Sequence, residues 1–122
     1  MKAYITRDSV HIVDDTTAPN ERRCKFRGDW SWAELVGEVW RASQLPSRIV
    51  GGQAAWVLSS GVPLAIAAQQ WSEPRILPAL DLQRKFLDIV DDQIRLHWSY
   101  LGTIDPSVAF DVLQRLRLRA QL

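Results

Sequence analysis

Gly51–Trp71 reads GGQAAWVLSSGVPLAIAAQQW, and this stretch decides the fold that the sequence predicts. Two apolar runs, Gln53–Ser59 and Val62–Gln70, flank the dipeptide Ser60-Gly61. Glycine adopts positive φ without steric cost, so the dipeptide suits the tight turn of a β-hairpin. The stretch therefore predicts two antiparallel strands.

The predicted hairpin is apolar on both faces. Pairing of Ser59 with Val62 sorts its side chains into two groups. These are Ala55, Val57, Leu64 and Ile66 on one face, and Trp56, Ala65 and Ala67 on the other. An edge strand of this kind would expose apolar side chains and invite pairing with other chains. We therefore expect the hairpin in the interior of a sheet, covered from both sides.

The residues before the hairpin predict strands joined by an exposed loop. Alternating polarity predicts strands at Lys2–Arg7 and Glu21–Arg27, with a short returning strand at Val10–Val13. Asp14–Asn20, DDTTAPN, has the composition of a solvent-exposed loop. The strand at 21–27 directs its cysteine and phenylalanine inward and its basic side chains outward, so it suits an edge of the sheet.

A helix of about 31–43 follows. Ser31 and Glu34 form the capping-box pattern, in which each side chain satisfies a backbone N–H of the other residue. The apolar residues that follow recur at helical spacing and form one stripe: Trp32, Leu35, Val36, Val39 and Trp40. We expect this stripe to pack on the hairpin, where the small side chains of Ala54, Ala65 and Ala67 leave room for the indoles.

The residues after the hairpin predict a second hairpin. Arg75–Leu82 fits a short irregular strand, and residues 82–90 fit either a helix or a strand. Ile94–Tyr100 alternates apolar and polar residues, which is typical of a half-buried strand. With Asp91-Asp92-Gln93 as a turn, Phe86–Val90 and this strand form the second hairpin.

The last predicted element is a helix of about 106–120. Asp105 is a suitable N-cap, and Pro106 suits the first helical position. Its expected buried stripe consists of Val108, Val112, Leu113, Leu116 and Ala120.

These elements predict an α+β fold, with residues 1–122 forming a single domain. The fold is an antiparallel β-sheet of about five to six strands, built from hairpins and packed with the two amphipathic α-helices. The sheet has two apolar faces. Either the two helices cover opposite faces, or one face binds a partner.

Composition excludes several functional classes. A formal net charge of +1 provides no bulk attraction to nucleic acid or to an anionic membrane. No stretch approaches the ~18 consecutive apolar residues of a membrane span, and the first ten residues lack the apolar core of a signal peptide. The single cysteine, Cys24, excludes an intramolecular disulfide and fits a reducing compartment. We therefore expect a cytoplasmic protein without nucleic-acid or membrane partners.

The sequence contains no recognisable catalytic or metal-binding motif. It lacks the nucleophile elbow, the P-loop, the dinucleotide fingerprint and the zinc-protease motif. His11 and His97 are not spaced as metal ligands, and His97 falls on the polar side of its strand, where a histidine is usually an ordinary surface residue. We therefore expect no enzyme activity, no metal and no cofactor.

Two features favour protein binding instead. The chain has six tryptophans, a residue type that often anchors interfaces, and two acidic doublets in predicted loops or turns. Acidic side chains steer a partner and fix its orientation, while an aromatic anchor supplies affinity. The candidate partner-binding residues are Asp14, Asp15, Trp71, Glu73, Asp91, Asp92 and Trp98.

Three segments carry a resemblance to a known class of proteins. They are YITRDSV followed by DD and AP, the hairpin stretch GGQAAWVLSSGVPLAIAAQQW, and IRLHWSYLG before the terminal helix. Together they resemble small bacterial α+β immunity proteins, the partners of secreted or contact-delivered toxins. The resemblance implies a non-enzymatic inhibitor that binds and neutralises one cognate toxin domain in the cytosol. The nearly neutral charge departs from the strongly acidic inhibitors of nucleases.

The sequence also fits two other functions. One is a structural or regulatory homodimer that uses the spare apolar face of the sheet as its interface. The other is a small enzyme or ligand carrier with a pocket lined by Trp56, Trp98 and Tyr100 and containing His97.

Overall fold

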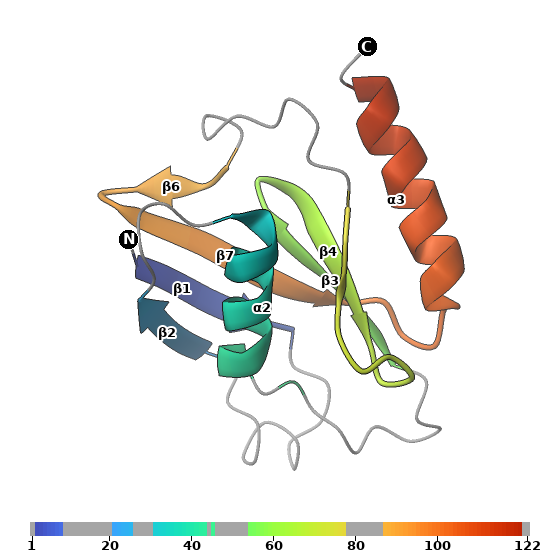
Figure 1. Ribbon diagram of the computed structural model, residues 1–122, viewed down its shortest axis with the longest axis horizontal. Helices are drawn as coiled ribbons and strands as arrows, with labels where there is room; N and C mark the ends of the chain where they lie inside the picture. Colours follow the sequence, from blue (N-terminus) through green and yellow to red (C-terminus); the bar gives the residue numbers. More distant parts are fainter. Residues whose placement is uncertain are drawn as a thin grey trace.

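The computed structural model describes residues 2–8, 21–25, 31–43, 45, 54–77 and 87–120, with side chains up to residue 116 in the last range. The described chain is an α+β fold in which two helices pack on a mixed, mostly antiparallel sheet (Figure 1). The elements are β1 (Lys2–Arg7), β2 (Glu21–Lys25), α2 (Trp32–Ser43), β3 (Ala55–Ser60), β4 (Val62–Ala68), β5 (Arg75–Ile76), β6 (Ile89–Val90), β7 (Gln93–Tyr100) and α3 (Pro106–Ala120). The predicted fold class is therefore confirmed.

The sheet has the strand order β2-β1-β7-β3-β4-β5, and β6 pairs separately with β7. The central hairpin β3–β4 lies inside the sheet as expected, and β2 lies at one edge. One pairing differs from an all-antiparallel arrangement, because β1 runs parallel to β7 with Ile5 beside Leu96. β1 thus lies between β2, with which it pairs antiparallel, and β7, with which it pairs parallel.

The register of the central hairpin differs from the predicted one. Ser60 pairs with Val62, and Gly61 between them has φ +71°. The register shifts between Leu58 and Ser59. On the far side of this shift from the turn, Leu58 pairs with Ala65 and Trp56 pairs with Ala67.

The extra residue at this shift is Leu64, which has no register partner on β3. A β-bulge of this kind places one additional residue on one strand and changes the direction of its side chain. Leu64 therefore joins the buried cluster with Leu58 instead of facing Val57 as predicted. The assignment of the other hairpin residues to the two faces stays as predicted, since Val57 lies beside Ile66.

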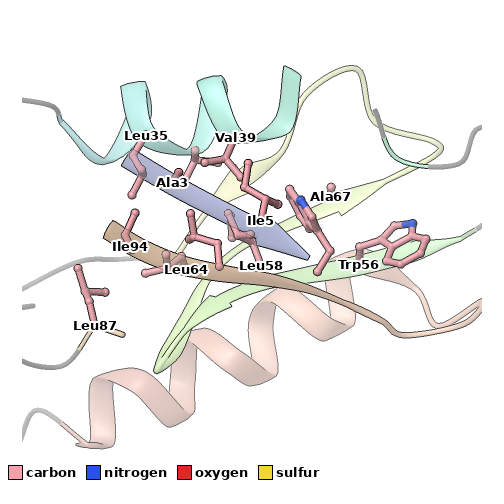
Figure 2. Close-up of a cluster of buried hydrophobic side chains, with 14 residues drawn as sticks. Ala3, Ile5, Leu35, Val39, Trp56, Leu58, Leu64, Ala67, Leu87 and Ile94 are labelled. Carbon is pink, nitrogen blue, oxygen red and sulfur yellow. The ribbon is translucent and has the colours of Figure 1, made fainter. Parts of the chain in front are cut away.

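The main core lies between α2 and the sheet (Figure 2). Leu35, Val36 and Val39 of the helix are at most 1% exposed and pack with the buried residues of β1, β3, β4 and β7. The Ser31 hydroxyl accepts the N–H of Glu34, which is half of the predicted capping box, and its other contact is to the Glu34 carboxylate at 3.2 Å. α2 is thus the predicted helix, but its place differs from the prediction. It lies nearest β2, β1 and β5, and its apolar side chains meet those of the hairpin β3–β4 only within the shared core.

The two described helices lie on opposite faces of the sheet, as Figure 2 shows. α3 contacts β4. Asp105 caps this helix as predicted, because its carboxylate accepts the N–H of Ser107 at 2.9 Å. The second apolar face is therefore covered in part by a helix of the same chain.

The buried stripe predicted for α3 is wrong at three of its positions, and the side chain of a fourth, Ala120, lies outside the described part of the chain. Val108, Val112 and Leu116 are 54%, 51% and 57% exposed, whereas Pro106 is buried and Leu113 is partly buried. The helix carries apolar residues around much of its circumference, so its pattern alone does not decide which row meets the sheet. Three large apolar side chains of α3 are therefore exposed to solvent.

The second hairpin is confirmed in its position, although its first strand is shorter than predicted. β6 and β7 are joined by Asp91 and Asp92, whose φ angles are +51° and +59°. Two successive residues with positive φ form a type I′ turn, which favours Asn-Gly because other residues are strained there. The Asp92 carbonyl also accepts the N–H of Lys2 at 3.0 Å, so the turn holds the start of β1.

This turn predicts a stabilising substitution. We expect Asp91→Asn/Asp92→Gly to raise the free energy of unfolding by about 0.5–1 kcal/mol, because the new residues adopt positive φ with less strain. Urea denaturation measures the change. The double substitution to alanine at the same two positions should instead lower stability, and equal stability of the two variants would contradict the argument.

Several predictions fall outside the described residues. These are the strand at Val10–Val13, the loop Asp14–Asn20, the inward side chain of Phe26, and residues 78–86. In the described part of the chain, no helix combines the length and the apolar character that crossing a membrane requires.

Candidate functional site

The face of the sheet opposite α2 carries an open polar groove. Alternation along β7 directs Arg95, His97 and Ser99 to this face, while Leu96 and Trp98 point into the core. The groove has a volume of about 380 Å³. We call it the polar sheet groove; its lining residues are Tyr4, Thr6, Ser59, Ser60, Gly61, Asp88, Arg95, Leu96, His97 and Ser99.

His97 is held at both ring nitrogens. Its Nε2 lies 2.7 Å from the Asp8 Oδ1, and its Nδ1 lies 2.7 Å from the Thr6 Oγ1. The parallel register places Thr6 directly beside His97, so the pairing of β1 with β7 creates the contact. The His97 side chain is 41% exposed. The imidazole is therefore fixed in orientation and accessible to a partner.

The Thr6 hydroxyl has two possible acceptors on β7. One is the His97 Nδ1 at 2.7 Å, when that nitrogen carries no hydrogen, and the other is the Leu96 carbonyl at 3.3 Å. The hydroxyl therefore ties β1 to β7 in either orientation.

Asp8 anchors the network to the backbone. Its N–H donates to the Trp98 carbonyl at 3.0 Å, and its Oδ2 accepts the Tyr100 N–H at 2.9 Å. Partial burial raises the pKa of Asp8, but the hydrogen bonds from Tyr100 and His97 and the charge of His97 outweigh this effect, so its pKa lies below the ordinary value of 3.8. The carboxylate extends the pairing of β1 with β7 past the end of β1.

The lowered pKa of Asp8 predicts a specific pH dependence. The folded state binds this proton less readily than the unfolded state, so the contribution is complete above the ordinary pKa and is lost as pH falls below about 4. We expect the wild type to lose more stability than Asp8→Asn between pH 7 and pH 2.5, measured by urea denaturation. Glu73→Gln, at an exposed position, is the control. Equal losses in wild type and Asp8→Asn would contradict this role.

An ion pair between Arg95 and Asp88 lies further along the groove. Arg95 Nη2 lies 3.1 Å from Asp88 Oδ1, and the Asp88 N–H donates to the Ser60 hydroxyl at 3.0 Å. These contacts connect β7 with the turn of the central hairpin. The exposed turn residues Asp91 and Asp92 precede β7 at this end.

The predicted partner-binding residues do not form one cluster. Asp14 and Asp15 lie outside the described residues. Glu73 is exposed in the loop between β4 and β5, at the end of the sheet away from the turn formed by Asp91 and Asp92 (Figure 1). Glu73 and the turn formed by Asp91 and Asp92 would therefore meet different parts of a partner.

The two tryptophans proposed as anchors have different environments. Trp71 is partly exposed and carries the Arg75 guanidinium 4.1 Å from its ring centroid. Trp98 is fully buried and its Nε1 donates to the Ser43 hydroxyl at 2.8 Å. Trp98 is therefore a core residue, and its proposed role as a surface anchor is wrong.

The predicted pocket, lined by Trp56, Trp98 and Tyr100 and containing His97, is not formed by these residues. Trp56 is 1% exposed and packs against Tyr100 with ring centroids 5.0 Å apart, while Trp98 lies in the same core. A cavity of about 170 Å³ does border Trp56, with Trp40 and Trp71 as its other aromatic residues. It does not contain His97, which lines the groove on the opposite face.

Sequence reasoning missed the network around His97. The alternation placed Thr6 and His97 on polar faces of their strands, but the contact requires parallel pairing of β1 with β7. No local signal in the sequence identifies that pairing. The sequence contains one indication of the network itself. Asp8, an acidic residue, directly follows a strand whose polar side chains include a threonine.

The described residues offer no ligand set for a metal ion, because no three of their His, Cys, Asp or Glu side chains are grouped closely enough. The half-buried thiol of Cys24 has a pKa above its ordinary value, first because of burial and second because of the nearby charge of Glu38. A thiol of this kind is a poor nucleophile at neutral pH.

No protein-family model matches this chain, and no curated protein or solved structure matches it either.

Proposed function

We propose that this chain is a non-enzymatic protein-binding module of the immunity type, which binds and neutralises a cognate toxin domain in the cytosol. The observation that carries the proposal is the polar sheet groove with its fixed, partly exposed His97. Small-molecule sites are usually enclosed, whereas this groove is open. Such a surface suits another protein.

The side chains of the groove are already arranged for binding. His97 is held by Asp8 and Thr6, and Arg95 is held by Asp88. Side chains that are ordered before association lose less conformational entropy when a partner docks. Charged groups at the margin then steer the partner and fix its orientation.

The triad-like order of Thr6, His97 and Asp8 does not by itself favour catalysis. Thr6 lies in a strand that is paired on both sides, and the Asp8 carboxylate is occupied by a backbone N–H as well as by the imidazole. These contacts support a role in holding two strands together. In this proposal, Thr6 and Asp8 therefore hold His97 in the orientation in which it binds the partner.

Co-expression with the product of the neighbouring gene tests the proposal. We expect that product to be toxic, to lose its toxicity when this chain is present, and to co-purify with it. Arg95→Glu and His97→Ala should each raise the Kd of the complex at least about tenfold, as residues at the centre of an interface do. Arg41→Glu, at an exposed position on α2, is the matched control. A harmless neighbour, or toxicity unchanged by this chain, would refute the proposal.

A further inference from the structure

α3 carries an exposed apolar row that the fold itself does not use. Val108, Val112 and Leu116 follow one another at four-residue intervals, so they form one row on the helix. Ile104, just before the helix, is also an exposed apolar residue. All four side chains are more than half exposed, between 51% and 57%. Contiguous apolar surface of this kind marks an interaction site.

The neighbouring row is charged and complementary to itself. Asp111 and Arg115 each precede a residue of the apolar row by one position, so they lie along the same flank of it. Both side chains are exposed. Among the side chains that the structure describes, up to residue 116, this flank presents one negative and one positive charge, one helical turn apart.

We propose that α3 pairs with α3 of a second copy of this chain, in antiparallel orientation. The twofold axis of an antiparallel pair relates the two helices so that the same flank of each faces the other. Val112 then lies close to its own counterpart, and Val108 meets Leu116 of the second copy. On the flank, Asp111 meets Arg115 of the second copy, and the symmetry forms this ion pair twice.

The charges select this orientation. In a parallel pair, opposite flanks would face each other, and Asp111 would not meet Arg115. α3 has 15 residues, so the pair extends over about 22 Å. A contact of this length lies at the low end of interface sizes, and we therefore expect a dimer that forms in the micromolar range.

Sedimentation equilibrium of the purified chain, from low to high micromolar concentration, measures the association. We expect the average mass to rise from that of one chain toward that of two. Val112→Glu should weaken the dimer at least about tenfold, because it buries two like charges beside each other. Ala33→Glu places the same charge at an exposed position on α2 and should leave the dimer unchanged.

Charge reversal tests the arrangement itself. Asp111→Arg and Arg115→Asp should each weaken the dimer about three- to tenfold, because like charges then face each other across the axis. The double variant Asp111→Arg/Arg115→Asp should restore it, since the reversed pairs are again complementary. Circular dichroism of dilute samples checks that each variant keeps its helix.

A cross-link provides a readout that does not depend on affinity. Because Val112 would lie beside its counterpart, Cys24→Ser/Val112→Cys should form a disulfide-linked dimer on mild oxidation. Cys24→Ser/Ala33→Cys, with its thiol on α2, should not. The proposal is overturned by a single-chain mass at every concentration, by a dimer that Val112→Glu leaves intact, or by a double charge reversal that stays as weak as the single ones. All these experiments use the chain alone, so their outcome is independent of any toxin.

Discussion

Trp98→Ala is expected to lower the free energy of unfolding by about 3–5 kcal/mol, the range typical of removing a buried tryptophan side chain. Trp98 is fully buried in the middle of the sheet, where it pairs with Leu58 and packs in the core beneath α2. The substitution would leave a large cavity and also remove the hydrogen bond to Ser43. Urea or thermal denaturation measures the loss.

Two further variants separate packing from hydrogen bonding. Trp98→Phe keeps most of the ring but removes the indole N–H, so it should cost less than Trp98→Ala. Ser43→Ala leaves the buried Trp98 N–H without its acceptor and should cost about 1–3 kcal/mol. The double variant Trp98→Phe/Ser43→Ala should cost less than the sum of the two single losses. If the loss of the double variant equalled the sum of the two single losses, the two groups would not interact energetically.

Val39→Asp is the second substitution with a large expected effect. Val39 is 0% exposed at the contact between α2 and the sheet, so the new carboxylate would be buried without a partner. Such a group costs several kcal/mol or forces the helix away from the sheet. We expect a loss of more than about 4 kcal/mol, or a chain that does not fold.

Ala33→Asp is the matched control for this substitution, because Ala33 is exposed in the first turn of the same helix. An acidic side chain near a helix N-terminus is neutral or slightly favourable. Urea denaturation of both variants gives the comparison. Similar stabilities of the two would mean that α2 does not pack on the sheet as the fold requires.

The fold class could be predicted because it depends on local signals. Gly61 marks the tight turn, the apolar runs on either side mark an interior hairpin, and the pattern Ser31 to Glu34 marks the start of α2. Each of these signals lies within a few residues of the structure that it specifies. They were sufficient for the order of elements and for most of the core.

The remaining features depend on contacts between distant residues. The extra residue Leu64 shifts the hairpin register, yet it looks like any other apolar strand residue. The row of α3 that meets the sheet is chosen by packing, since the helix is apolar on more than one side. Thr6 and His97 are 91 positions apart, so the centre of the candidate site exists only after the sheet has formed.

The place of β1 in the sheet also affects synthesis of the chain. During translation, β1 leaves the ribosome before the other strands of the sheet and can pair early with β2, but its other neighbour, β7, is made about 90 residues later. At roughly 5–20 residues per second, the ribosome needs several seconds to supply that strand. Through this interval Ala3 and Ile5 lack the partners that finally bury them. The nascent chain therefore passes through a period in which a chaperone would protect it from aggregation.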